Sequence, residues 1–112
     1  MKIVSTSIEP GRGSQACVEF VIRVSLTGPP TECEVTGRVV GPQAKGFTTL
    51  EIAYTLVPVE ASDNVVSLRC VIPEPTLWTR DAPFGYAWSV EVRVNGALTD
   101  TRAGSLAFPA PR

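Results

Sequence analysis

The sequence contains no histidine, and its three cysteines form no Cys-x-x-Cys pair. Without histidine, neither a Ser-His-Asp nor a Cys-His catalytic arrangement can form. A zinc site is not expected either, because histidine and paired cysteines are its usual ligands. The segment Gly-Arg-Gly at 11–13 is not followed by Lys-Ser/Thr or by a helical pattern, so it is not a phosphate loop. We therefore predict no catalytic residues, no cofactor and no metal.

The sequence also lacks an excess of charge and any long apolar run. Ten basic and eleven acidic residues give a net charge of −1, which argues against binding to nucleic acid or to an anionic membrane. No apolar stretch approaches the roughly 18 residues of a membrane helix, and no signal peptide or Asn-x-Ser/Thr site is visible. The compartment stays open: cytoplasmic, or part of a secreted multidomain protein.

Cysteine is too scarce and too unevenly placed to predict a disulfide framework. An odd number of cysteines cannot pair completely within one chain. Cys33 and Cys70 fall at expected core positions, where cysteine usually acts as a small hydrophobic residue. Trp78 and Trp88 both follow the last cysteine, unlike the tryptophan of antibody domains, which lies between two bridged cysteines. We expect free, unreactive thiols, with one disulfide as the alternative.

Carboxylates are plentiful, but the pattern places no two of them across a cleft, as glycoside hydrolysis requires. Glu32 and Glu34 share one expected strand face, whereas Asp63, Asp81 and Asp100 lie near turns. We interpret them as solvated strand faces and turn caps. The chain is therefore not expected to be an enzyme by itself.

What the sequence does contain is alternation of apolar and polar residues, which is typical of half-buried strands. One face of a segment near residue 50, for example, carries Leu50, Ile52, Tyr54 and Leu56. Expected strands cover about 2–8, 18–26, 33–39, 50–56, 66–72, 88–94 and 98–108.

Turn residues separate these strands. Gly-Pro, Gly-Arg-Gly and Ser-Asp-Asn segments lie between them, and Asn95-Gly96 is a strong hairpin signal because a type I′ turn needs positive φ at both central residues. About seven strands at this spacing predict an all-β, immunoglobulin-like antiparallel β-sandwich. We place this domain at 1–108 and interpret 109–112, Pro-Ala-Pro-Arg, as a linker stub.

The stretch from Pro73 to Val94 is the most distinctive part of the chain. A strand leads into a proline, a Leu-Trp element, a Pro-Phe-Gly-Tyr element, an alternating strand, and a hairpin that runs into an aspartate. The residues of this motif are Pro73, Leu77, Trp78, Asp81, Pro83, Tyr86 and Asp100.

This motif resembles the end of the immunoglobulin-like domain of family 2 glycoside hydrolases (β-galactosidase, β-glucuronidase, β-mannosidase). The resemblance covers roughly a third of the chain, with Gly85 where the family usually has leucine. The family continues with a Gly-Phe-Arg-like junction before its catalytic barrel, whereas this sequence reads Gly-Ser-Leu-Ala-Phe-Pro at 104–109. The resemblance implies a non-catalytic accessory module, because the family's catalytic glutamates lie on the barrel.

The motif also has a physical interpretation. Its prolines stiffen a crossing from one sheet to the other, where a strand ladder cannot continue. Trp78 is large enough to plug the end of the sandwich, and Tyr86 can bury its ring and bond its hydroxyl to the main chain.

Three functions are consistent with this pattern. The first is a spacer and packing surface whose partners are neighbouring domains of a larger polypeptide. The second is a carbohydrate-binding module in which Trp78, Phe84 and Tyr86 stack on sugar rings. The third is an adhesion or assembly domain that uses an open sheet edge.

Overall fold

The computed structural model describes residues 1–13 and 17–108 and contains seven antiparallel strands. A single 3₁₀ turn, η1 (Pro30–Glu32), joins two of the strands. The linker stub predicted at 109–112 lies outside the described residues. The strands are β1 (Ile3–Gly13), β2 (Cys17–Leu26), β3 (Glu34–Gln43), β4 (Ile52–Ser62), β5 (Val65–Pro73), β6 (Gly85–Val94) and β7 (Ala97–Leu106).

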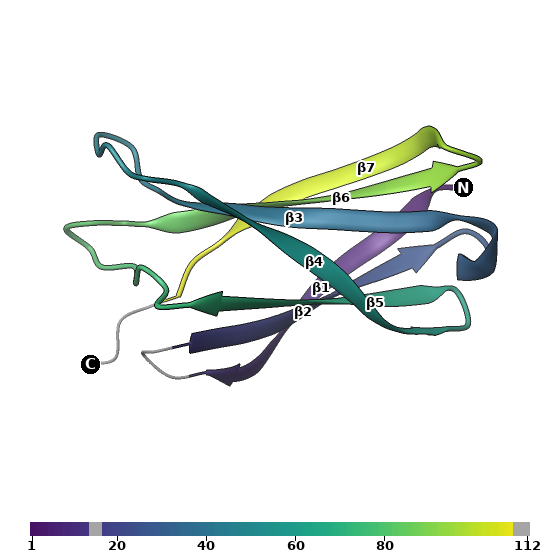
Figure 1. Cartoon of the computed structure of the whole chain (residues 1–112), viewed down its shortest axis with the longest axis horizontal. Helices are drawn as coiled ribbons and strands as arrows, with labels where there is room; N and C mark the ends of the chain where they lie inside the picture. Colours follow the sequence, from purple (N-terminus) through teal and green to yellow (C-terminus); the bar gives the residue numbers. More distant parts are fainter. Residues whose placement is uncertain (14–16, 109–112) are drawn as a thin grey trace.

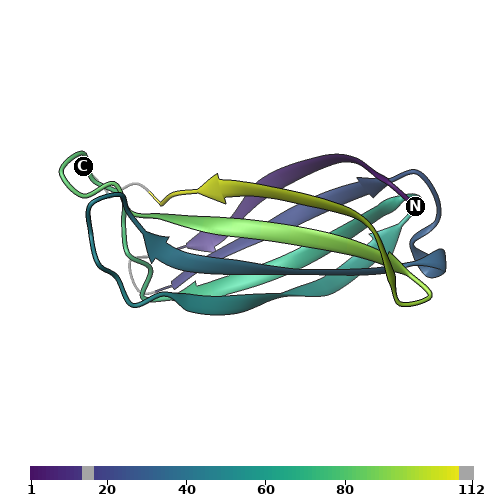
Figure 2. The ribbon, with the colours of Figure 1, turned by 90° about the horizontal axis from the view of Figure 1, so that it is seen from above.

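The strands form one curled sheet in the order β1-β2-β5-β4-β3-β6-β7 (Figure 1). Strand β4 joins the two halves: its first part, from Ile52 to Leu56, pairs with β3, and its second part, from Val57 to Ser62, pairs with β5. The sheet therefore consists of one half with β1, β2 and β5 and another with β3, β6 and β7 (Figure 2). This arrangement confirms the predicted all-β, sandwich-like class, while the immunoglobulin-like detail stays a prediction.

The core lies between the two halves and is built from the alternating residues that the sequence indicated. In β2, Phe20, Ile22, Val24 and Leu26 are all buried, and the residues between them face outward. Burying such side chains stabilises the fold by about 1.5–3 kcal/mol each. From the other strands, the core receives Ile3, Val35, Val39, Leu56, Val66, Leu68, Cys70, Ile72, Tyr86, Trp88, Val90 and Val92.

The sequence interpretation was wrong about the apolar face of β4. Leu50 is 87% exposed and Ile52 is 50% exposed, and only Leu56 of that expected face is fully buried. The reason is that β4 is an edge strand in both halves of the sheet. It pairs with β3 up to Leu56 and with β5 from Val57 onward. Only the point of crossing lies over the core.

Two strands run further than their turn residues indicated. Strand β1 continues past Ile8 to Gly13, and β3 continues through Gly41 and Pro42. In both places the ladder shifts register, which lets a strand accommodate glycine and proline. The hairpin between β6 and β7 is as predicted, with φ of 51° at Asn95 and 81° at Gly96.

Candidate functional site

The motif predicted from the sequence forms the crossing between the two halves of the sheet. Strand β5 pairs with β2 and β4, and β6 pairs with β3 and β7, so the segment between them changes halves as expected. Tyr86, at the start of β6, is 2% exposed. The Thr76 N–H donates a 2.9 Å hydrogen bond to the Tyr86 hydroxyl oxygen, which confirms the expected tie to the main chain.

Removal of this hydroxyl gives a direct test of the tie. We expect Tyr86→Phe to lower the free energy of unfolding by about 1–2 kcal/mol, because the ring stays buried while the Thr76 N–H loses its partner. Urea denaturation of the variant and the wild type measures the difference. A variant as stable as the wild type would show that water replaces the hydroxyl without cost.

The aromatic ring that closes this end of the sandwich is that of Phe108. Its centroid lies 6.0 Å from that of Phe20 and 5.4 Å from that of Tyr86. Trp78, to which the sequence interpretation gave this place, is 40% exposed. Its contribution comes from the main chain, because the Trp78 N–H donates a 2.8 Å hydrogen bond to the Phe108 carbonyl. No local pattern singled out Phe108, which follows the last strand.

The remaining residues of the motif lie along the crossing. Pro73 is exposed at the end of β5, and Leu77 is half-buried. Asp81 and Pro83 are exposed on either side of Ala82, whose carbonyl accepts a 3.1 Å hydrogen bond from the Thr79 N–H. These residues shape the loop and do not converge on a cleft.

The three candidate sugar-stacking rings do not share one surface. Tyr86 is enclosed in the core, so its faces are not available to a sugar. Phe84 is half-buried and packs on Phe47, with ring centroids 5.2 Å apart. Only Trp78 combines a large ring with substantial exposure.

The crossing lies beside the loop that joins β3 to β4, and together they form one end of the molecule (Figures 1 and 2). This end carries Phe47, Leu50, Trp78 and Phe84, which we name the apolar end face. Phe47 is 47% exposed and Leu50 still more. Sequence reasoning identified Trp78 and Phe84 but placed Leu50 in the core and did not single out Phe47.

Asp100, the last residue of the motif, joins β7 to the start of β1. One carboxylate oxygen accepts a 2.8 Å hydrogen bond from the Ile3 N–H, and the other accepts one of 2.9 Å from the Thr101 N–H. The Arg102 guanidinium donates to the Ile3 carbonyl at 3.0 Å. These side chains take the place of a strand ladder between β1 and β7. The hydrogen bond from Ile3, with smaller effects from Thr101, Lys2 and Arg102, lowers the pKa of Asp100.

A lowered pKa makes this contribution to stability depend on pH. The ionised carboxylate stabilises the fold above the pKa that Asp100 has in the unfolded chain, and the contribution is lost as the pH falls through the lower folded-state pKa. We expect Asp100→Asn to flatten the acid limb of a plot of unfolding free energy against pH, below about pH 4. Acid-side denaturation curves of the variant and the wild type measure the difference, and equal slopes in the two proteins would contradict the assignment.

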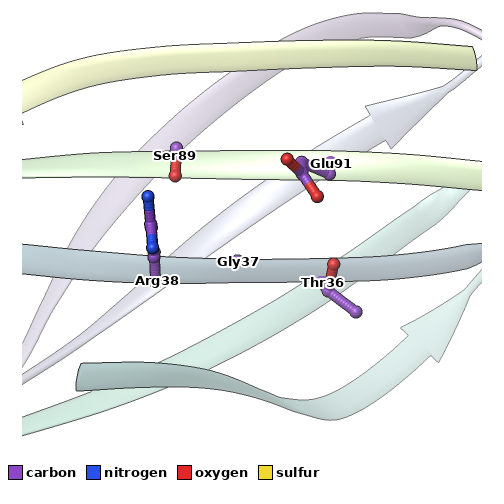
Figure 3. Close-up of a pocket in the computed structure, with 5 residues that line it drawn as sticks. All are labelled: Thr36, Gly37, Arg38, Ser89 and Glu91. Carbon is purple, nitrogen blue, oxygen red and sulfur yellow. The ribbon is translucent and has the colours of Figure 1, made fainter. Parts of the chain in front are cut away.

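A polar hollow of about 300 Å³ lies on the outer face of β3 and β6 (Figure 3). Thr36, Arg38, Ser89 and Glu91 surround it, and Gly37 lies between two of them. The single carboxylate, that of Glu91, accepts a 2.6 Å hydrogen bond from Arg93. The hollow therefore lacks the two opposed carboxylates of a glycosidase. Across residues 1–13 and 17–108, no cluster of three potential ligands could hold a metal.

Cys17, Cys33 and Cys70 are unbridged in the structure. Cys70 is 3% exposed, and its burial raises the thiol pKa to about 11. Burial also raises the pKa of the half-buried Cys33. Because the thiolate is the reactive form, Cys70 is a packing residue and not a nucleophile. The part of the chain that the structure describes also has no helix long and apolar enough to cross a membrane.

The fold is similar to that of a segment in several solved β-glucuronidases. An FMN-binding β-glucuronidase from Facaelibacterium prausnitzii L2-6 matches with a TM-score of 0.65 and 18% identity, over 92% of this chain and 15% of its own. The Bifidobacterium dentium β-glucuronidase matches with a TM-score of 0.63 and 16% identity, over 96% of this chain and 17% of its own. Bacteroides uniformis β-glucuronidase 2 matches with a TM-score of 0.58 and 20% identity, over 92% of this chain and 13% of its own.

These similarities show the fold. The chain spans less than a fifth of the length of each of these enzymes. No protein-family model matches the sequence, and no curated protein matches it either.

Proposed function

We propose that this chain is a non-catalytic accessory β-sandwich module of a multidomain glycoside-hydrolase-like protein, where it acts as a spacer and a packing surface for neighbouring domains. The similarity to a segment of β-glucuronidases, over 13–17% of their chains, supports this proposal. The sequence resemblance around Leu77-Trp78 points to the same kind of module independently. In that family, the catalytic glutamates belong to a separate barrel.

The apolar end face is the observation that carries the packing role. It exposes Phe47, Leu50 and Trp78 on two adjacent loops, away from the polar outer face of β3 and β6. Gathered exposed apolar residues mark surfaces that another protein surface covers. The same end holds Phe108, the last described residue, so a following segment would leave the domain beside this face.

The charged groups support a non-catalytic role. Glu9, Glu19 and Glu91 each form an ion pair with an arginine on the outer faces of the strands. Asp100 is used in joining β1 and β7. A glycosidase needs two carboxyl groups that face each other across a cleft, whereas these four carboxylates are already bonded to arginine side chains or to main-chain N–H groups.

The first test is the size of the native polypeptide. Immunoblotting of source cells with an antibody to the domain, followed by mass spectrometry of the band, should reveal a protein far above 12.0 kDa whose peptides include a barrel with paired glutamates. A band near 12.0 kDa would overturn the accessory-module proposal.

The packing role has its own test. Hydroxyl-radical footprinting of the 112-residue chain and of the native polypeptide should show Phe47, Leu50 and Trp78 protected only in the longer protein. Leu98, which is 52% exposed near the hairpin between β6 and β7, is the internal control and should react equally in both. Equal reactivity of the end face in both proteins would contradict its role as a packing surface.

Carbohydrate binding is the second candidate function, because the exposed Trp78 ring is available for stacking on a sugar. The chain has two tryptophans, so Trp88→Phe leaves Trp78 as the only one, and Trp78→Phe leaves Trp88 as a buried control. Titration with xylo-, manno-, cello- and glucuronic acid oligosaccharides should leave the Trp78 fluorescence unchanged if the face packs against protein. A saturable change confined to the variant with Trp78 would favour sugar stacking.

A further inference from the structure

The inner face of β1 is not fully covered by the rest of the fold. Thr6, Ile8 and Pro10 lie directly opposite Val24, Ile22 and Phe20 of β2, all three of which are buried. Residues opposite each other in an antiparallel pair lie on the same face of the sheet, so Thr6, Ile8 and Pro10 face inward. Ile8 is nevertheless 39% exposed, and Pro10 is exposed as well.

The exposure arises because β1 and β7 meet at one end only. Strand β1 pairs with β2 alone, and β7 pairs with β6 alone. Three hydrogen bonds tie the two strands together near Ile3: the Lys2 ammonium donates to the Thr99 carbonyl, the Ile3 N–H donates to the Asp100 carboxylate, and the Arg102 guanidinium donates to the Ile3 carbonyl. Beyond this point the strands run apart toward the end that carries the C-terminus (Figure 1). Each therefore presents an unpaired strand edge along the opening.

An apolar groove of about 330 Å³ occupies the opening. Its described lining is mostly apolar and comes from β1, from β2 and from the end of β7 with the residues that follow it: Ile8, Pro10, Val18, Phe20, Leu106 and Phe108. Glu19, a charged residue that also borders the groove, accepts a 2.7 Å hydrogen bond from Arg69 with its carboxylate. The described part of the lining therefore offers apolar contacts beside the two strand edges, with no unpaired charge among these residues to attract an ionic ligand.

We propose that an extended, uncharged segment with alternating apolar residues binds in this groove as an added strand between β1 and β7, and that it comes from elsewhere in the same longer polypeptide. Strand addition matches both features of the opening, because edge groups supply main-chain hydrogen bonds and the groove accepts every second side chain. The source of the segment rests on the proposed function.

A second copy of this chain is a poorer donor. All the strands in the described part of the chain are already paired within the sheet. A strand inserted between β1 and β7 must pair on both of its sides, whereas every strand of a second copy keeps at least one neighbour from its own sheet. We therefore assign the segment to a part of the longer polypeptide other than residues 1–13 and 17–108.

The test uses the uncharged peptide acetyl-Ser-Thr-Val-Thr-Val-Thr-Val-Ser-amide and NMR spectra of the 112-residue chain. We expect saturable shifts at amides of β1 and β7 that border the groove, around Ile8 and Leu106. Ile8→Glu should weaken binding at least about tenfold. Val4→Glu is the matched control, because Val4 lies on the same strand, is 59% exposed and does not line the groove.

Three outcomes would overturn the proposal. They are an absence of saturable shifts up to about 1 mM peptide, shifts along β4 in place of β1 and β7, and peptide binding that Ile8→Glu leaves unchanged. Ile8→Thr, which keeps a β-branched side chain but loses apolar area, provides a second variant if the glutamate disturbs folding, and it should weaken binding to a smaller extent.

Analytical ultracentrifugation of the 112-residue chain alone tests whether a second copy, and not another part of the same polypeptide, supplies the bound segment. A concentration-dependent dimer that Ile8→Glu abolishes would assign the groove to a second copy. A native polypeptide near 12.0 kDa would overturn both the proposed function and the assignment of the bound segment to a longer polypeptide. A failure of the peptide to bind would contradict only the proposal that the groove accepts an added strand. The two proposals therefore fail through different measurements.

Discussion

Trp88→Ala is expected to lower the free energy of unfolding by about 3–5 kcal/mol, the range for truncating a buried large aromatic residue. The Trp88 side chain is 8% exposed, and its indole lies against Gly104 on the neighbouring strand. An added Cβ at Gly104 would come within 2.7 Å of the indole ring, so the glycine leaves the space that the ring fills. Truncation would leave a cavity at the centre of the half formed by β3, β6 and β7.

Trp78→Ala is the matched comparison, because it removes the same side chain from the exposed crossing. Trp78 is 40% exposed, and its hydrogen bond to Phe108 comes from the main chain, which the substitution preserves. We expect a loss of about 1–2 kcal/mol at this position. Urea denaturation with comparison of m-values measures both variants. Equal losses would mean that Trp78 is as enclosed as Trp88 and would remove it from the apolar end face.

Gly37→Ala is expected to lower the free energy of unfolding by about 2–3 kcal/mol, because the added methyl group overpacks the interior. Gly37 lies on β3 between the outward-facing Thr36 and Arg38, so its Cβ would point inward. An ideal Cβ there would lie 2.6 Å from the Ser89 carbonyl oxygen and 2.7 Å from a methyl carbon of Leu56. The carbonyl belongs to the adjacent strand and cannot move without shifting the ladder.

Gly28→Ala is the control for this prediction. Its Cβ would meet the flexible end of Met1, which can move aside, and Gly28 lies outside the strands. We expect a change within about 0.5 kcal/mol, typical of a surface position. Thermal and urea unfolding of both variants would test the difference. Similar stability for the two would show that β3 and β6 separate easily at Gly37.

Strands that lie inside the sheet were the easiest to predict. In β2, β5 and β6, pairing on both sides holds the strand flat over the core, so alternation in the sequence becomes alternation of burial. Asn95-Gly96 specified its hairpin locally, because only the conformations of those two residues were needed. Tyr86 could be assigned to the core for a related reason: it continues the inward face of Trp88.

Edges and ends were harder to predict, because burial there depends on segments far away in the chain. Leu50 and Leu56 look equivalent in the sequence, yet only Leu56 lies where β4 passes over the core. Trp78 and Phe108 lie at the same end of the sandwich, joined by a main-chain hydrogen bond, but it is the Phe108 ring that packs on Tyr86. Ile8 continues an inward face but remains exposed because β7 runs away from it.

The sequence by itself determined the all-β class, the approximate number of strands and most of the core, since these depend on composition, period-two alternation and local turn chemistry. Only the tertiary structure decided which apolar residues of the edges and loops stay uncovered. The apolar end face and the groove at Ile8 both arise this way. Exposure at such positions depends on which distant strand lies alongside, and no local pattern carries that information.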